Sequence, residues 1–333
     1  MHARSTAVFA VARFAPYAVR RVPRRGIGPA EVLVVLVVVA ILALLLMLGL
    51  ARSREVARSA TCSRNLQQIG LAMQLYEQVT QRVPYVAPLE DRNNASQGPL
   101  AAILQQLGRT EVTGLDIQPD SEPAPPLSEP ISERYLPDFV CPSDPIATSR
   151  VFPAPVNYRA NTGDQPEGRG GPFMPGGSIG FNEVEAGDGA SYTAAFAERL
   201  VGTAGTSTET SRDYQLVPGP VPREGCPEVP GEPLQTDAGR SWLELGWRST
   251  LYSHALVPQN PRSCIDEQGR TALMGASSGH VEGVRVLLMD GSVRVYSRSI
   301  NPEVWASLGT YLSDVSQEET PESSSLPDEP TEP

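Results

Sequence analysis

The feature that most constrains this chain is an uninterrupted apolar run of 20 residues from Val32 to Ala51. As a helix that rises about 1.5 Å per residue, the run spans roughly 30 Å, which matches the hydrocarbon core of a bilayer. The residues before Glu31 include six arginines and no acidic residue. Because positive charge is retained on the cytoplasmic side, we expect a single-pass inner-membrane anchor with a cytoplasmic N-terminus.

A cleaved secretory signal is the alternative reading of this run. The apolar core of such a signal is usually about 7–15 residues long, so the run is too long for one. The residues Gly49, Leu50 and Ala51 would nevertheless pass as a small-x-small cleavage site.

Charge and composition exclude one class of partner and indicate a loop-rich fold. The net charge of −11 repels phosphate backbones, and no basic stripe follows the N-terminal region, so we expect no nucleic-acid binding. The 333 residues include 32 Pro and 29 Gly, which fits one folded domain with long irregular loops. Irregular loops are predicted at 120–133 and 163–177, and a disordered acidic tail is predicted at 316–333.

An amphipathic helical stem is predicted directly after the apolar run. Cys62, Leu66, Ile69, Met73 and Tyr76 follow one another at spacings of 4, 3, 4 and 3, which places them on one helix face. We expect a sheet to cover this face and the helix to end before position 84, a proline. A short second helix is predicted over residues 100–107, between a proline and a glycine.

The clearest β signal is a hairpin near the C-terminus. Val284, Val286 and Leu288 alternate before the pair Asp290-Gly291, and the alternation resumes over residues 293–295. Asp-Gly suits the positive backbone angles of a tight turn, so the pair needs no catalytic explanation.

Several blocks of the sequence, taken in order, carry a family resemblance. They are Arg24-Arg25-Gly26 with Glu31, the stem block CSRNLQQIGLA (62–72), FVCPSDP (139–145), NYRANTG (157–163), DGASYT (188–193), His280 followed by Asp290-Gly291, and VWASLGT (304–310). The chain resembles the prepilin-like proteins that carry an N-terminal cleavage and methylation segment and a body of unknown function, abundant in planctomycete-type bacteria. The resemblance covers about residues 24–310, and its specificity lies in the order of the blocks.

The resemblance implies an α+β, type IV pilin-like fold. In such a fold a long N-terminal transmembrane and stem helix packs on an antiparallel β-sheet with long irregular loops. The implied boundaries are a basic leader at 1–26, a transmembrane helix at 27–51, a periplasmic stem at 52–83, a periplasmic α+β body at 84–315 and the tail at 316–333.

The resemblance also implies a function by assembly and no known reaction, so we expect no enzyme activity. Prepilin peptidase would cut between Gly26 and Ile27, and Glu31 would serve assembly with other pilin-like subunits, identical or different, in a type II secretion or pilus-like system in the inner membrane. The sequence departs from the family pattern at Pro29, where a leucine is usual, and at Leu48, where a proline is usual. The alternative function is a membrane-anchored periplasmic binding or scaffolding protein that does not polymerise.

The cysteines of the chain favour disulfides over a zinc site. The 4 Cys residues lack C-x-x-C spacing, which suits an extracytoplasmic domain better than a metal centre. Three pairings are possible. The order of the family blocks favours Cys62 with Cys141 and Cys226 with Cys264.

Other patterns carry weaker alternatives. His280 and Asp290 are ten residues apart, roughly 33 Å if extended, so they cannot share one metal ion. We expect His280 to be hydrogen-bonded to backbone at a strand start, with a local site made with other residues as the alternative. Glu183, Glu185 and Asp188 could bind calcium, but an exposed acidic turn is favoured and no cofactor is expected.

Two sequence motifs are set aside because their context is wrong. Residues 269–291 read like one ankyrin repeat, but no second copy exists and a single repeat cannot bury its own face. Residues 275–279 satisfy G-x-S-x-G, but a strand follows instead of a helix and the catalytic order of a hydrolase is absent.

Overall fold

The computed structural model describes residues 26, 28–89, 97–109, 131–205, 208–258 and 262–312. The basic leader up to residue 25, Ile27, most of the loop at 120–133 and the acidic tail lie outside the described residues. The chain divides into two compact units, Met1–Ser53 and Arg54–Pro333.

The first unit contains the N-terminal stretch of α1, which runs from Pro29 to Thr80. Its described large apolar side chains, from Val32 to Met47, are 47% to 71% exposed. Among the residues whose backbone and side chains are both described, no helix is long and apolar enough to cross a membrane. The membrane span expected at Val32–Ala51 therefore stays a prediction.

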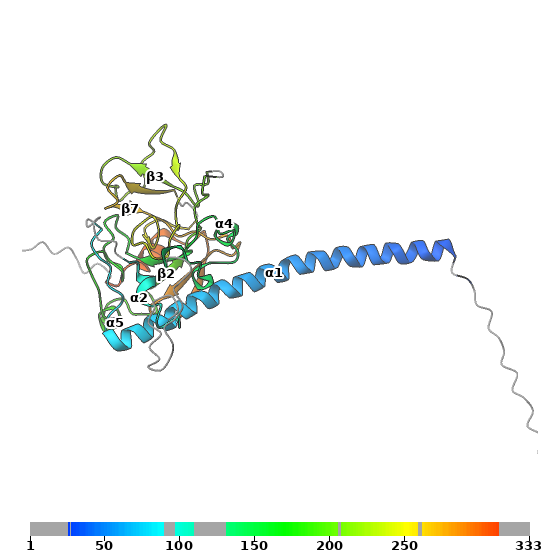
Figure 1. The fold of residues 1–333 in the computed structure, drawn as a ribbon, viewed down its shortest axis with the longest axis horizontal. Helices are drawn as coiled ribbons and strands as arrows, with labels where there is room; N and C mark the ends of the chain where they lie inside the picture. The colour runs from blue at the N-terminus through cyan, green and yellow to red at the C-terminus, as the bar shows by residue number, and fades with distance from the viewer. Residues whose placement is uncertain are drawn as a thin grey trace, which may run out of the picture. The chain divides into compact units, whose positions relative to one another are not determined.

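The second unit is a mixed α/β body built around two sheets. The first sheet has the order β5 (Leu251–Tyr252), β1 (Tyr158–Asn161), β2 (Ala194–Glu198), β8 (Val284–Leu288) and β9 (Val293–Tyr296). The second has the order β4 (Leu234–Gln235), β3 (Tyr214–Val217), β6 (Ser263–Asp266) and β7 (Ala272–Leu273). Figure 1 shows this second sheet on the side of the body away from the stem of α1.

The expectation of a single antiparallel sheet is wrong. The pairs β1–β5 and β3–β6 are parallel, and the other pairs are antiparallel. Parallel neighbours need a long crossover connection, and this loop-rich chain supplies one between the two strands of each pair.

The remaining helices that the structure describes are short. They are α2 (Pro99–Ala102), η1 (Ile131–Glu133), η2 (Pro137–Phe139), α4 (Pro145–Thr148), α5 (Phe181–Ala186) and α6 (Pro302–Ser307). The helix expected over 100–107 is shorter than predicted, because Ile103 leaves the helical conformation and turns continue to Gly108, whose φ is +72°. Burial of Ile103 and Leu104 fixes these turns against the core.

The predicted buried face of the stem is confirmed. Cys62, Leu66, Ile69 and Met73 are at most 1% exposed, and Tyr76 packs at the edge of the same core. The helix ends at Thr80 because the next residue has a left-handed backbone, a common way to end a helix.

The predicted hairpin is also confirmed. Leu287 on β8 lies opposite Val293 on β9, and the amide of Gly291 donates to the carbonyl of Leu288 at 3.0 Å. Gly291 has a φ of +85°, whereas Asp290 has no positive φ. The turn is therefore a type I turn followed by a glycine bulge, in which only the glycine needs the left-handed region.

Strand β8 is buried on both faces and connects the stem to a second core. Leu287 lies in the main core with the stem residues, whereas Val284, Val286 and Leu288 pack with Trp305 in a separate cluster. Because side chains alternate along a strand, Arg285 shares the face of Leu287 that looks toward α1. The stem approaches this face closely: a Cβ built on Gly70 would lie 2.8 Å from Leu287 Cδ1.

Candidate functional site

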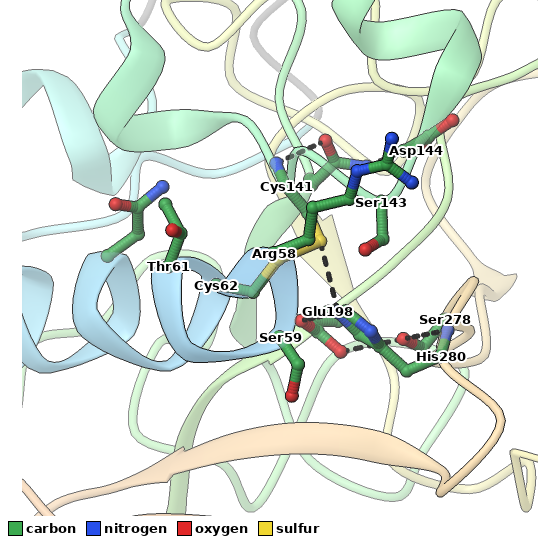
Figure 2. Close-up of a disulfide and its surroundings, with 12 residues drawn as sticks. Arg58, Ser59, Thr61, Cys62, Cys141, Ser143, Asp144, Glu198, Ser278 and His280 are labelled. Atoms are coloured by element: carbon green, nitrogen blue, oxygen red, sulfur yellow. Dashed lines mark hydrogen bonds and ion pairs between the residues drawn. A yellow bond between two sulfur atoms is a disulfide. The ribbon is translucent and has the colours of Figure 1, made fainter. Parts of the chain in front are cut away.

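Charged and sulfur-containing side chains meet where the stem of α1 crosses the five-stranded sheet (Figure 2). We call this group the His280 cluster. It consists of Glu55 and Cys62 on α1, Cys141 just after η2, Glu198 at the end of β2, His280 just before β8, and Arg285 on β8. Strands β2 and β8 are direct neighbours in the sheet, which brings their charged ends together under the helix.

The imidazole of His280 lies at the centre of the cluster. Its Nδ1 is 2.9 Å from Glu55 Oε1, and its Nε2 is 3.3 Å from Cys141 Sγ. The same Nε2 lies 3.6 Å from Glu198 Oε1. The expectation that this ring is hydrogen-bonded to backbone is wrong, since its neighbours are side chains brought together by the fold.

Glu198 is buried and only half satisfied. Its Oε2 accepts hydrogen bonds from Ser278 Oγ at 2.8 Å and from the amide of Arg285 at 3.1 Å. Its Oε1 is buried and accepts no hydrogen bond from the described residues. Burial raises the pKa of Glu198 above its usual value, although His280 and Arg285 act to lower it.

Glu55 occupies the opposite, partly exposed side of His280. Burial acts to raise its pKa, but the hydrogen bonds from His280 and Ser143 and the nearby charge of Arg58 together hold the pKa below its usual value. The His280 ring therefore lies between a partly exposed carboxyl group with a lowered pKa, Glu55, and a buried carboxyl group with a raised pKa, Glu198.

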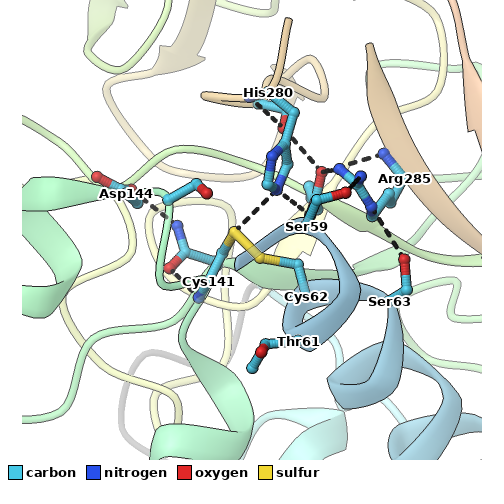
Figure 3. Close-up of polar contacts among 12 residues, drawn as sticks. Ser59, Thr61, Cys62, Ser63, Cys141, Asp144, His280 and Arg285 are labelled. Carbon is cyan, nitrogen blue, oxygen red and sulfur yellow. Dashed lines mark hydrogen bonds and ion pairs between the residues drawn. A yellow bond between two sulfur atoms is a disulfide. The ribbon is translucent and has the colours of Figure 1, made fainter. Parts of the chain in front are cut away.

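Arg285 links the strand to the helix (Figure 3). Its Nε donates to Ser63 Oγ at 3.0 Å, and its Nη2 donates to Ser59 Oγ. Residues 59 and 63 are one helical turn apart, so they present both hydroxyls on one face of α1. Its Nη1 lies 3.8 Å from Glu198 Oε2, which places the arginine beside the same buried carboxyl group.

Both disulfides favoured by the block order are present. Cys62 is bonded to Cys141 with a Cα–Cα distance of 5.1 Å, and Cys226 is bonded to Cys264 with a Cα–Cα distance of 5.6 Å. The first joins the stem of α1 to the body and lies against His280. The second joins Cys264, on β6 of the four-stranded sheet, to Cys226 in the segment between β3 and β4.

A second buried ionic group adjoins the cluster. Asp144 Oδ1 accepts a hydrogen bond from Arg212 Nη1 at 2.8 Å, and Asp144 Oδ2 accepts one from Asn157 Nδ2, also at 2.8 Å. The side chain of Asn157 in turn accepts from the amide of Cys141 at 2.9 Å. The blocks at 139–145 and 157–163 thus form one structural network.

Other predicted residues lie apart from the cluster. Asp290 sits in the hairpin turn, where its Oδ2 accepts from Ser191 Oγ at 2.7 Å. Although partial burial acts to raise it, the hydrogen bonds from Ser292 and Ser191 hold the pKa of Asp290 below its usual value. Asp290 therefore stabilises the turn and does not join His280.

The acidic residues considered for calcium bind their own loops. Glu183 Oε1 accepts from the amide of Gly180 at 3.3 Å, and Glu185 Oε2 accepts from the amide of Ala190 at 3.0 Å. In both contacts the carboxylate accepts a hydrogen bond from a nearby backbone amide and stabilises the local backbone. The favoured expectation here is an exposed acidic turn, and calcium binding by Glu183, Glu185 and Asp188 stays its alternative.

The residues predicted for processing and assembly lie in the first unit. Glu31 is in the first turn of α1, where its Oε2 accepts from the amide of Gly28 at 3.2 Å. This contact satisfies one of the unpaired amides at the start of a helix. Gly26 is described and Ile27 is not, so the cleavage site itself stays a prediction.

Sequence reasoning missed the role of His254. This residue packs against Tyr252 and Trp305, which belong to the second core cluster on one face of β8. The ring is fully buried, stacks on Trp305 with 3.8 Å between ring centroids, and lies 2.8 Å from the hydroxyl of Tyr252. Burial lowers its pKa to about 3. No local pattern marks this contact, because Trp305 comes from the block near the C-terminus.

The His280 cluster is largely buried and cross-linked by a disulfide. These features suit a site that binds a metal or anchors the stem better than an open active site. Among the described residues, one group could hold a metal ion. It consists of Cys62, Cys141, Glu198 and His280, whose ligand atoms lie within 4.8 Å of one another. Two open cavities formed by described residues of the body lie elsewhere, one beside Arg270 and one beside Gln268. The arrangement therefore fixes the stem to the body in the first instance.

Comparison with known proteins assigns a family without a known activity. No curated protein and no solved structure matches the chain. A family model described as a protein of unknown function, DUF1559, matches residues 51–303, which contain every member of the His280 cluster and both disulfides. The chain therefore belongs to the DUF1559 family.

Proposed function

We propose that the protein is a pilin-like subunit, of the pseudopilin type, in a type II secretion or type IV pilus-like assembly. It is made as a precursor that prepilin peptidase cuts between Gly26 and Ile27. It is an inner-membrane protein with a cytoplasmic N-terminus and a periplasmic body, and it acts by assembly and not by catalysis.

The observation that carries this proposal is the contrast between the two stretches of α1. In the N-terminal stretch every described large apolar side chain from Val32 to Met47 is about half exposed or more. In the stem a single face is buried, and it is cross-linked to the body through Cys62. A helix that is apolar all round needs lipid or other helices around it, whereas the stem has its partner within the chain.

The full apolar run of the sequence supports membrane insertion. It includes positions 46 and 48–51, whose side chains the structure does not describe. With these positions the run from Val32 to Ala51 reaches the roughly 20 residues that a bilayer-spanning helix needs. Two disulfides in the body also fit an oxidising compartment outside the cytoplasm.

Glu31 supports assembly in place of simple anchoring. A carboxylate at the head of a membrane helix is unfavourable unless it is paired. Its contact in the described chain is the amide of Gly28. Cleavage after Gly26 would add an α-amino group about one helical turn away, on the same subunit or on a neighbour, and that charge would offset the cost.

The experiment is N-terminal sequencing of the protein purified from membranes that contain prepilin peptidase. We expect the mature chain to begin at Ile27 and the Gly26→Val variant to keep its leader, because the peptidase must close around the residue before the cut. Pro29→Leu restores the usual family residue and should be processed at least as well as the parent. A start at Arg52 would indicate signal peptidase, and a start at Met1 would indicate a plain anchor.

Assembly is tested separately by cross-linking between subunits. Glu31→Leu should be processed normally and yet give fewer cross-linked oligomers. Glu77→Leu is the control, since it removes a glutamate from the far end of the same helix. Undiminished oligomers in Glu31→Leu would favour the alternative of an anchored scaffold that does not polymerise.

A further inference from the structure

We propose that the reduced form of this protein binds one zinc ion through Cys62, Cys141, Glu198 and His280. The disulfide and the metal are then two exclusive states of the same site. This inference concerns the body alone and does not depend on processing or assembly.

The distances from His280 to its two neighbours are those between ligands of a tetrahedral zinc site, whereas the two sulfurs are bonded to each other and separate only on reduction. Nε2 of His280 is 3.3 Å from Cys141 Sγ and 3.6 Å from Glu198 Oε1, and the whole set lies within 4.8 Å. Zinc bonds of about 2.0 Å to nitrogen or oxygen and about 2.3 Å to sulfur separate neighbouring ligands by roughly 3.3–3.8 Å. Reduction frees the two sulfurs to move apart toward this geometry.

The unsatisfied oxygen of Glu198 points to a missing positive partner. Buried polar atoms almost always have a hydrogen-bond partner, and Oε1 accepts none from the described residues. The other oxygen, Oε2, is held by Ser278 and by the amide of Arg285, so Oε1 is directed at His280 and the sulfurs. Figure 2 shows Glu198 beside His280, below the sulfur of Cys141.

His280 has the orientation of a metal-binding histidine. Its Nδ1 lies 2.9 Å from the Glu55 carboxylate, to which it donates, and this contact leaves Nε2 for the metal. Metal-binding histidines characteristically donate their other ring nitrogen to a carboxylate, which fixes the tautomer and increases ligand basicity. Glu55 would therefore act as a positioning residue that does not touch the metal.

The local charges balance when the metal is bound. Two thiolates and the Glu198 carboxylate carry three negative charges, which zinc reduces to one. Arg285 lies 3.8 Å from Glu198 Oε2, is 1% exposed and supplies the remaining positive charge. The zinc ion, its four ligands and Arg285 together carry no net charge, which lowers the cost of burying them.

The exchange between the two states is a thiol–disulfide reaction followed by metal binding. A dithiol reductant transfers two electrons to the Cys62–Cys141 bond, which breaks to give two thiols, while the reductant becomes a cyclic disulfide. Zinc then replaces the two thiol protons, which leave to solvent. Either state holds the stem of α1 to the segment after η2, where the Cα atoms are 5.1 Å apart.

The second disulfide is an internal control. Cys226 and Cys264 lie in an apolar cluster with Val217 and Leu273, and Cys226 Sγ lies 3.9 Å from the carbonyl of Leu273. No histidine or carboxylate of the described residues forms a metal-suited group with this pair. Reduction alone should therefore not make it a zinc site.

The test uses the full-length chain in detergent, reduced with a phosphine and titrated with cobalt(II). We expect the visible absorption of tetrahedral cobalt and a thiolate charge-transfer band at one equivalent, both lost when zinc is added. Zinc should then protect Cys62 and Cys141 from alkylation and leave Cys226 and Cys264 reactive, as read by mass spectrometry. The absence of tetrahedral absorption, or equal protection of both pairs, would overturn the proposal.

Variants separate the metal site from general effects of reduction. Cys226→Ser with Cys264→Ser should bind zinc like the parent, whereas Cys62→Ser with Cys141→Ser should not bind. Glu55→Gln should weaken zinc binding about 10- to 100-fold, the usual effect of losing a carboxylate that orients a metal-binding histidine. Glu282→Gln is the matched control, because Glu282 pairs with Arg285 at 3.2 Å, is exposed and lies outside the set of ligands.

Folding of each variant is checked in its oxidised form, where the melting temperature does not depend on the metal. Glu55 is partly exposed, so its substitution should leave the oxidised protein folded. Parent-like zinc affinity in Glu55→Gln would contradict the assigned orientation of His280. Parent-like affinity in the Cys62→Ser, Cys141→Ser protein would refute the site.

Discussion

The two histidines of the body lie in opposite surroundings. His280 is held between two carboxyl groups, whereas His254 lies among aromatic rings, against Tyr252 and Trp305. His254 is thus kept neutral by burial, and its hydrogen bond with the hydroxyl of Tyr252 satisfies Nδ1. His280 is therefore part of a charged site, and His254 is part of the aromatic core.

The buried His254 predicts a loss of stability in mild acid. Its folded pKa is about 3, against an ordinary value of 6.5. Between these values the unfolded chain binds a proton that the folded chain does not, so stability is full above about pH 6.5 and falls as the pH decreases. Urea unfolding at several pH values between 7 and 4 measures this slope.

The control for this prediction is the slope of the His254→Phe variant, which keeps a ring on Trp305 but does not titrate. Glu198 acts in the opposite direction, because its raised pKa gives a contribution that is lost as the pH rises. His254→Phe should therefore flatten the fall in acid or reverse it. An unchanged slope would show that His254 is not the group responsible.

Asp144 gives a second prediction at the scale of single residues. It is fully buried and bound to Arg212, whose guanidinium is also buried. Asp144→Ala should lower the free energy of unfolding by about 3–5 kcal/mol, because it leaves a buried charge without its partner. The matched control is Glu209→Ala, which removes an exposed partner of the same arginine and should cost about 0–1 kcal/mol.

The Asp144 prediction is measured by chemical unfolding of both variants. Similar small losses for the two substitutions would mean that water reaches Arg212. The interpretation of Asp144 as a buried structural anion would then fail.

At the scale of elements, the turn of the β8–β9 hairpin restricts most clearly which residue can occupy a position. Gly291 has a φ of +85°, and a Cβ built there would lie 2.9 Å from Gln74 Nε2 on the stem. Gly291→Val should destabilise the body by at least about 1–2 kcal/mol, the cost of a left-handed backbone for a residue with a Cβ. Thermal unfolding measures the loss, and Gly291→Asn should lose less because asparagine tolerates this region.

An equal effect of valine and asparagine at position 291 would point to the contact with Gln74 and not to the backbone angle. Gln74→Ala separates the two, since it removes the side chain that a Cβ would meet. In that background Gly291→Val should still be destabilising. A parent-like melting temperature for Gly291→Val itself would contradict the observed turn.

Elements with a local signal could be predicted from the sequence, and those made by distant segments could not. The stem face and the hairpin follow from spacings of three or four residues and of two residues, which depend only on the element itself. The parallel pairing of Ala160 with Leu251 depends on a long crossover connection, which has no periodic pattern in the sequence. The second helix is shorter than predicted because burial of Ile103 and Leu104 outweighs local preference.

The same reason explains what could be predicted of the candidate site. The disulfide pairing follows from the order of blocks, but Glu55 and His280 are separated by 225 residues and carry no shared pattern. Arg285 contacts Ser63 across 222 residues, and Gln74 contacts Asp290 across 216. The C-terminal segments of the body return to the stem and complete its polar contacts, so the site exists only in the whole folded body.

The last prediction concerns the two disulfides as constraints on the whole molecule. The Cys62–Cys141 bond closes a segment with a separation of 79 residues, and the Cys226–Cys264 bond closes one of 38. Each should contribute about 2–4 kcal/mol by restricting the unfolded chain, and the longer loop should add about 0.6 kcal/mol more.

Replacing Cys62 and Cys141 by serine should also speed hydrogen exchange in α1 between positions 54 and 80, because the stem loses its covalent link to the body. Replacing Cys226 and Cys264 should lower the global stability but leave exchange in the stem slow until the body unfolds. Equal exchange of the stem in the two variants would show that the polar contacts of Arg285 and Gln74 hold α1 in place without the disulfide.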